Sequence, residues 1–198
     1  MKKEHNILYR ILRPIVKYLF LIFYRPTIIG KENIPKTGAV VICGNHTNNF
    51  DIPLLFCSTK RTIHFLAKDE LFKGMGKYFF KAMACIPVNR RQKDHDALEK
   101  AIEELNNGEL IGIFPEGTFN KTNEIIMPFK YGAVAMASRT NSTIVPFSIT
   151  GKYKIFKKNS ITICFGKPYK IKTDDLTEAN EELMDKVKKL IVKNRSDK

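Results

Sequence analysis

The stretch of sequence that decides the fold class is Leu110-Ile111-Gly112-Ile113-Phe114-Pro115-Glu116-Gly117-Thr118. Its first five residues form a short apolar run of the kind found in buried strands. In the turn that follows, Pro115 stiffens the exit from the strand and Gly117 permits a positive φ. A turn at the carboxyl end of a strand is where α/β folds place ligand contacts, although an isolated turn of this kind also occurs on ordinary surfaces. The stretch therefore predicts an α/β fold with Glu116, Gly117 and Thr118 beside a ligand.

The same alternation continues on both sides of this stretch. Short apolar runs predict strands at residues 39–43, 62–67, 85–88, 143–149 and 161–165. Helical spacing of apolar residues predicts helices at 97–105 and 131–138, an interrupted helix at 71–83 and a helix near residue 190. No repeat or linker divides this pattern. We therefore expect a single α/β domain with a mixed central sheet flanked by helices.

The charge of the chain indicates an anionic partner. The 198 residues include 34 Lys and Arg against 20 Asp and Glu, a formal net charge of +14. Residues 125–173 contain Lys and Arg but no Asp or Glu. Such an excess fits nucleic acid, an acidic membrane surface or a phosphorylated ligand. Nucleic acid is disfavoured because lysine dominates and the aromatic residues do not alternate with arginine as stacking platforms do.

Residues 6–24 predict an amphipathic helix. Arg10, Arg13 and Lys17 fall on one stripe, and apolar residues fill the broad remainder of the helical wheel. The uncharged runs are too short to cross a bilayer, whereas a basic stripe beside an aromatic-rich apolar face is typical of helices in the membrane interface. The alternative is a core-packing helix whose basic side chains reach out to water. Pro14 is expected to kink the helix or divide it in two.

A candidate catalytic pair follows the strand at 39–43. His46 lies on the loop that leaves this strand, and Asp51 comes five residues later. If the chain turns into a helix between them, Asp51 can accept a hydrogen bond from one ring nitrogen and leave the other free to accept a substrate proton. The chain has no Gly-x-Ser-x-Gly nucleophile, so direct activation of a substrate hydroxyl is favoured over a covalent intermediate. Alone, such a histidine is usually structural.

The cysteines do not predict a metal site. Cys43, Cys57, Cys85 and Cys164 are widely spaced and form no Cys-x-x-Cys pair, which zinc sites usually require. Cys43, Cys85 and Cys164 sit in apolar runs, where a thiol packs as a small hydrophobic group. We interpret the cysteines as buried free thiols.

Four ordered motifs make the sequence resemble the glycerolipid acyltransferase family. The resemblance spans roughly residues 25–170, and the N-terminal amphipathic segment is also similar to that of the family. The motifs, in chain order, are Asn45-His46 with Asp51, Ile86-Pro87-Val88-Asn89-Arg90, Phe114-Pro115-Glu116-Gly117-Thr118, and Ile144-Val145-Pro146-Phe147.

The resemblance implies transfer of a fatty acyl chain from an acyl thioester to the free hydroxyl of 1-acylglycerol 3-phosphate, giving phosphatidic acid for phospholipid synthesis. His46 would be the general base and Asp51 would orient it. Arg90 would pair with the substrate phosphate, with Arg91 as a possible substitute. Glu116, Gly117 and Thr118 would hold the glycerol and phosphate region. No cofactor or metal is implied, and acyl-CoA or acyl-carrier protein would serve as co-substrate.

The resemblance also implies a location and a set of partners. We expect residues 1–26 to be a membrane-association segment and residues 27–198 to be the acyltransferase domain. The protein would sit on the cytoplasmic face of the membrane, peripheral or monotopic, with a lysophospholipid, an acyl donor and an anionic membrane surface as partners and no nucleic acid. Acyl-carrier protein is a further candidate partner.

The sequence departs from the family pattern after Thr118. The family commonly continues with Arg and Ser, where this chain has Phe119 and Asn120. Lys121 or Lys130 would then have to supply the missing phosphate contact, without the bidentate fork of a guanidinium. This leaves two alternatives open: an acyltransferase for another lysolipid acceptor, or a catalytically degenerate basic membrane-binding module.

Overall fold

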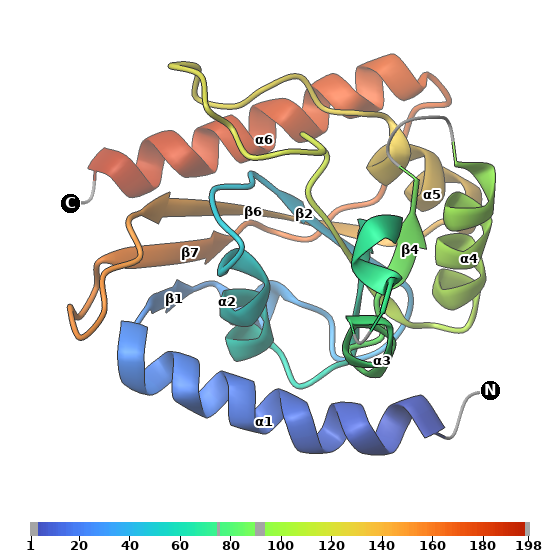
Figure 1. Ribbon diagram of the computed structural model, residues 1–198. Helices are drawn as coiled ribbons and strands as arrows, with labels where there is room; N and C mark the ends of the chain where they lie inside the picture. The colour runs from blue at the N-terminus through green and yellow to red at the C-terminus, as the bar shows by residue number, and fades with distance from the viewer. Residues whose placement is uncertain (1–3, 75, 90–93, 197–198) are drawn as a thin grey trace.

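A mixed sheet runs through the middle of the molecule (Figure 1). The structure is a computed structural model that describes residues 4–74, 76–89 and 94–196. Within these residues the sheet has seven strands in the order β1-β7-β6-β2-β5-β3-β4. All neighbouring pairs are parallel except β6 and β7. The strands are β1 (Thr27–Ile29), β2 (Val40–Gly44), β3 (Ile63–Lys68), β4 (Ile86–Val88), β5 (Leu110–Ile113), β6 (Thr143–Gly151) and β7 (Ile161–Phe165).

Helices cover both faces of this sheet (Figure 1). The α-helices are α1 (Glu4–Tyr24), α2 (Asp51–Ser58), α3 (Gly76–Ala82), α4 (His95–Asn106), α5 (Gly132–Thr140) and α6 (Leu176–Ser196), with short 3₁₀ turns η1 (Lys31–Asn33) and η2 (Asp69–Phe72). In β2, Val40 and Ile42 pack with the core of α1 and α2, while Val41 and Cys43 pack with the core of α4, α5 and α6. A strand that is buried on both faces reads as a continuous apolar run, as this one does. The predicted single α/β domain with a mixed sheet is confirmed.

The predicted elements differ from the observed ones in a few places. The strand predicted at 161–165 agrees with β7. The interrupted helix predicted at 71–83 is instead two separate elements, η2 and α3. Strand β1 has no counterpart among the predicted strands. It is only three residues long and pairs with β7 at the edge of the sheet, so it lacks the apolar run of a central strand.

Helix α1 packs against α2 with one face and exposes the other. Tyr9, Phe20 and Tyr24 are buried in the core on the inner face. The helix is continuous through Pro14, so the expected division does not occur. Because buried side chains anchor it on both sides of the proline, the loss of one backbone hydrogen bond does not end it. The exposed apolar side chains of the outer face are Ile11, Ile15, Tyr18, Leu19, Ile22 and Phe23.

Of the helices in the described residues, none combines the length and the apolar character that crossing a membrane requires. The assignment of residues 1–26 to membrane association and 27–198 to the catalytic domain stays a prediction.

One residue of the predicted basic stripe has a structural partner. The guanidinium of Arg13 donates hydrogen bonds to the carbonyl oxygens of Phe56, at 3.0 Å, and Lys60, at 3.1 Å. These carbonyls lie in and just after the last turn of α2, where a helix leaves its backbone acceptors unpaired. Arg13 therefore fastens α1 to the end of α2. The inner side of α1 therefore packs against the core, as the alternative interpretation of this helix expected.

Candidate active site

The two loops that carry the main motifs leave the same edge of the sheet. Strands β2 and β5 are parallel neighbours, with Cys43 opposite Ile113 at their carboxyl ends. The loop after β2 contains His46, and the loop after β5 contains Glu116. Because parallel neighbours end at the same edge, sequence segments 70 residues apart meet there, as expected for a site in an α/β sheet.

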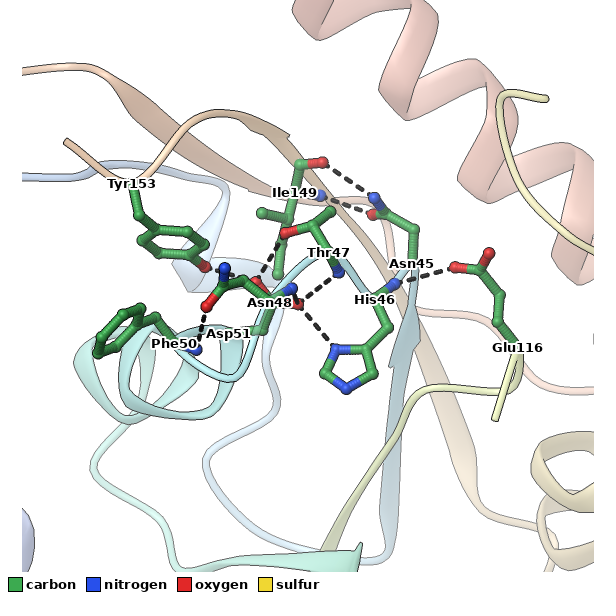
Figure 2. A network of polar contacts seen from close by, with 9 residues as sticks. All are labelled: Asn45, His46, Thr47, Asn48, Phe50, Asp51, Glu116, Ile149 and Tyr153. Atoms are coloured by element: carbon green, nitrogen blue, oxygen red, sulfur yellow. Dashed lines mark hydrogen bonds and ion pairs between the residues drawn. The ribbon is translucent and has the colours of Figure 1, made fainter. Parts of the chain in front are cut away.

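Asn45 fixes the first loop to β6. Its side-chain amide donates to the carbonyl oxygen of Ile149 at 2.9 Å, and its amide oxygen accepts from the N–H of Ile149 at 2.8 Å (Figure 2). Both bonds are buried. The paired geometry resembles a rung of a sheet, made by a side chain instead of a backbone. Asn45 thus determines where His46 emerges from the edge of the sheet.

His46 and Asp51 form the predicted imidazole–carboxylate pair. The Nδ1 atom of His46 lies 2.8 Å from Oδ2 of Asp51 (Figure 2). The chain begins α2 at Asp51, so the turn that the sequence argument required is present. With Nδ1–H donating to the carboxylate, Nε2 is left as the nitrogen that can accept a proton. This is the arrangement of a general base oriented by an acid.

The Asp51 carboxylate is fully buried and saturated with donors. It accepts hydrogen bonds from the backbone N–H groups of Thr47 and Asn48, from the Thr47 hydroxyl and from the hydroxyl of Tyr153, in addition to His46. The Tyr153 bond is 2.5 Å long and comes from the segment after β6. Burial, together with the neighbouring Asp51 charge, raises the pKa of Tyr153, so its hydroxyl stays protonated and donates. These donors offset the cost of burying the carboxylate charge.

Two phenylalanine rings contact the imidazole of His46. Phe114 stacks on it with ring centroids 3.9 Å apart and planes inclined by 14°, and Phe119 lies against it at 4.4 Å. Phe114 ends the strand run of the third motif, and Phe119 occupies the position where the family commonly has arginine. The rings restrict the rotation of the imidazole and lower its exposure to water. Phe119 therefore has a defined place at the site, against the ring of His46.

Glu116 joins the two motif loops. Its Oε1 atom accepts from the backbone N–H of His46 at 2.9 Å, and Oε2 accepts from the N–H of Met127 at 2.9 Å. The side chain is only 3% exposed. Burial raises the pKa of Glu116, while its two backbone hydrogen bonds act in the opposite direction. Since both oxygens point into the protein, Glu116 holds the His46 loop in place.

The remaining residues of the third motif form a tight turn. The N–H of Gly117 donates to the carbonyl of Phe114 at 3.0 Å, and Gly117 has a φ of +72°, a conformation that favours glycine. A Cβ atom at Gly117 would lie 3.1 Å from Cε and Nζ of Lys130, so the lysine side chain runs across the turn. Thr118 is exposed beside it. The contact with Gly117 places the Lys130 side chain at this turn. Arg90, the predicted phosphate ligand, and Arg91 lie outside the described residues.

Three residues with a clear place at the site have no role in the prediction from the sequence. Tyr153 lies 102 positions from Asp51, and no local spacing connects them. Asn45 belongs to the first motif, and Phe119 stands where the sequence departs from the family pattern; neither position by itself indicates a contact at the site. The hint for Asn45 was its position directly after a buried strand, where a polar side chain must find a partner. For Tyr153 the sequence contains no such hint.

Comparisons with known proteins identify the family of the chain. The model of the family described as Acyltransferase matches residues 25–150. The chain is 33% identical to the 1-acyl-sn-glycerol-3-phosphate acyltransferase of Bacillus subtilis over 147 residues, covering 71% of this chain and 72% of the relative. It is 37% identical to the enzyme of the same name from Borreliella burgdorferi, covering 72% of this chain but 58% of that relative.

A solved structure shares the fold. The crystal structure of the 1-acyl-sn-glycerophosphate (LPA) acyltransferase PlsC from Thermotoga maritima superposes with a TM-score of 0.80 and 25% sequence identity. The match covers 98% of this chain and 84% of that one. Since the family match spans most of the chain and contains both motif loops, this protein belongs to the Acyltransferase family.

Proposed function

We propose that this protein transfers a fatty acyl group from an acyl thioester to the free hydroxyl of 1-acylglycerol 3-phosphate, giving phosphatidic acid. The observation that carries the proposal is the hydrogen bond between Nδ1 of His46 and Oδ2 of the buried Asp51. It orients an imidazole at the edge of the sheet where the Phe114–Thr118 turn also lies. The relatives from Bacillus subtilis and Borreliella burgdorferi bear the name of this activity.

The reaction follows from the orientation of His46. Nε2 removes the proton from the acceptor hydroxyl while its oxygen attacks the thioester carbonyl carbon. Asp51 stabilises the imidazolium that forms, and backbone N–H groups at the loops are suited to the developing oxyanion. When the tetrahedral intermediate collapses, the carbon–sulfur bond breaks and the proton on Nε2 passes to the departing thiolate. The step needs no covalent enzyme intermediate.

The acceptor head group would lie at the second loop. We propose that Gly117 and Thr118 contact the glycerol and that Lys130 faces the phosphate, because its side chain crosses the turn. For Arg90 the same phosphate contact is proposed from the family resemblance alone. Glu116 contributes from beneath by holding the loop of His46. We propose no cofactor, and either acyl-CoA or acyl-carrier protein as the donor.

Phe119 supports a second candidate, an acyltransferase for a different lysolipid. Its ring contacts His46 at the position where the family commonly has arginine. An aromatic ring gives an apolar contact in place of a bidentate phosphate contact. A phosphate monoester carries up to two negative charges and a phosphodiester only one, so a lysolipid whose phosphate carries a further substituent would lose less electrostatic attraction from this exchange.

We also propose that the protein works at the cytoplasmic surface of an anionic membrane. The support is the row of apolar side chains on the outer face of α1, in a chain with a net charge of +14. Such a face lies favourably at the boundary between head groups and acyl chains. The acceptor would then reach the site from the bilayer.

Product analysis tests the function. Purified protein is incubated with acyl-CoA or acyl-carrier protein and a panel of lysolipids that differ in head group. Lysophosphatidic acid should give the largest kcat/KM, and His46→Ala should abolish product formation while the fold, followed by circular dichroism, is retained. Full activity of His46→Ala would contradict the mechanism. A larger kcat/KM with another lysolipid would select the second candidate, and no product with any pair would leave a binding module.

A further inference from the structure

The turn between β6 and β7 exposes two large apolar side chains among lysines. We call residues 152–158 the hairpin tip; its sequence is Lys-Tyr-Lys-Ile-Phe-Lys-Lys. Ile155 is 60% exposed and Phe156 is 64% exposed, and the four lysines are exposed as well. Phe156 is also held at a φ of +59°, a region that bulky residues rarely occupy. An exposed Ile-Phe pair on a strained turn is a feature that folding alone does not require.

The hairpin tip lies against the end of α1 (Figure 1). The N–H of Phe156 donates to the carbonyl of Phe23 at 2.6 Å, and the rings of these two residues have centroids 5.5 Å apart. The N–H of Asn159 donates to the carbonyl of Arg25 at 3.1 Å. Phe156 thus continues the exposed apolar face of α1 onto a second element, distant in sequence.

We propose that the hairpin tip inserts Ile155 and Phe156 into an anionic lipid bilayer, with Lys152, Lys154, Lys157 and Lys158 contacting the lipid head groups. The inference rests on the proposed function, because it assumes that the acceptor lies in a membrane. Apolar side chains gain by leaving water for the acyl region, and each lysine near an anionic surface adds attraction. No ion pair between described residues occupies these lysines.

The alternative occupant is an acidic protein, such as an acyl-carrier protein. The lysines alone would suit either partner. The membrane is favoured because Phe156 adjoins Phe23, and with it the apolar row of α1, which offers an extended apolar face to a planar surface.

The hairpin tip is also connected to the catalytic pair. Tyr153, at the start of the tip, donates its hydroxyl hydrogen bond to Asp51 at 2.5 Å. Only two residues separate it from Phe156. Insertion of the tip would therefore determine the distance of the His46–Asp51 pair from the bilayer surface.

A single tryptophan tests insertion directly, because the chain contains none. Phe156→Trp places the probe on the hairpin tip, and Val192→Trp places it at an exposed apolar position on α6, which covers the opposite face of the sheet. With phosphatidylcholine–phosphatidylglycerol vesicles, the Phe156→Trp emission should shift to the blue and be quenched by brominated lipid. The Val192→Trp emission should change little.

Binding measurements separate the apolar and the charged contributions. In vesicle co-sedimentation, Ile155→Ser with Phe156→Ser should lower the partition coefficient about tenfold. Lys157→Gln with Lys158→Gln should lower it about fivefold per lysine on anionic vesicles. The matched pair Lys188→Gln with Lys193→Gln removes the same charge from α6 and should have a smaller effect.

The results also distinguish this inference from the proposed function. If Phe156→Trp forms phosphatidic acid from monomeric substrate but shows no blue shift with vesicles to which it binds, the inference is overturned and the function stands. A blue shift without product would support insertion and contradict the function. A shift induced by acyl-carrier protein in solution, with none on vesicles, would overturn the inference in favour of the acidic protein.

Discussion

The carboxylate of Glu116 accepts a hydrogen bond of 2.9 Å from the backbone N–H of His46. The two residues belong to different motif loops, on neighbouring parallel strands. The second oxygen of Glu116 accepts from the N–H of Met127, so one buried side chain joins the loop of His46 to the segment around Met127. The conformation of the loop that carries His46 therefore depends on a buried glutamate of the neighbouring motif loop.

Burial of Glu116 predicts a specific dependence of stability on pH. Burial raises its pKa in the folded state above the value near 4.3 of an unfolded glutamate. Between these two pKa values the folded protein binds more protons, so stability falls as pH rises. The contribution is fully present below the unfolded pKa and is lost as pH passes through the folded pKa.

The comparison of wild type with Glu116→Gln isolates this effect. The difference in free energy of unfolding, wild type minus variant, should decrease as the pH is raised from 4 toward 7. Urea denaturation at each pH measures it, and Glu181→Gln on the exposed surface of α6 provides the reference for loss of a surface carboxylate. A difference that is constant or grows with pH would contradict the assignment.

Removing the hydroxyl of Tyr153 should weaken catalysis more than substrate binding. Tyr153→Phe deletes the 2.5 Å hydrogen bond to Asp51 and leaves the ring in place. Because a bond to a charged group contributes about 1.5–3 kcal/mol, kcat should fall roughly tenfold while KM stays nearly unchanged. Steady-state kinetics with lysophosphatidic acid provides the measurement.

Tyr24→Phe is the matched control. The ring of Tyr24 contacts that of Tyr153, with centroids 5.8 Å apart, and its hydroxyl is not among the donors to Asp51. Its kcat should stay within about twofold of wild type, in line with the small effect expected away from the carboxylate network. Equal losses in the two variants would mean that Tyr153 acts only through packing.

The sequence predicted the sheet well because its central strands carry continuous apolar runs. The runs at 39–43 and 110–114 correspond to β2 and β5, and their adjacency follows from the rule that parallel strands end at a common edge. The edge strand β1 was not predictable, since three residues that pair only with β7 show no distinctive pattern. The continuity of α1 through Pro14 was not predictable either, because intrinsic preference does not include the packing of α1 on α2.

The site was predicted where residues are close in sequence. His46 and Asp51 are five positions apart, and a helix start at Asp51 was enough to bring them together. Tyr153 and the contact of Phe119 with His46 depend on how distant segments cross, which one sequence does not encode in any short pattern. The inward direction of Glu116 has the same origin, because its partners are backbone groups. The roles of the site residues stay predictions.

Arg13 should contribute more than Arg10 to the free energy of unfolding. Arg13→Gln removes the hydrogen bonds to the end of α2 and should lower the free energy of unfolding by about 1–3 kcal/mol. Arg10 is exposed on the same helix, so Arg10→Gln should change it by less than about 0.5 kcal/mol. Urea denaturation compares the two. If Arg13→Gln is as stable as Arg10→Gln, the attachment of α1 to α2 does not depend on this guanidinium.

Lys130 should contribute to recognition of the acceptor phosphate more than Lys121 does. The side chain of Lys130 runs across the turn at Gly117, whereas Lys121 is exposed in the adjoining loop. Because one charge-assisted contact to phosphate contributes about 1.5–3 kcal/mol, Lys130→Gln should raise KM for lysophosphatidic acid roughly tenfold and leave kcat nearly unchanged. Lys121→Gln removes the same charge and should raise KM less than threefold. A monoacylglycerol acceptor, which has no phosphate, should show no difference between wild type and Lys130→Gln. If Lys121→Gln has the larger effect on KM, the phosphate lies on the other side of the turn.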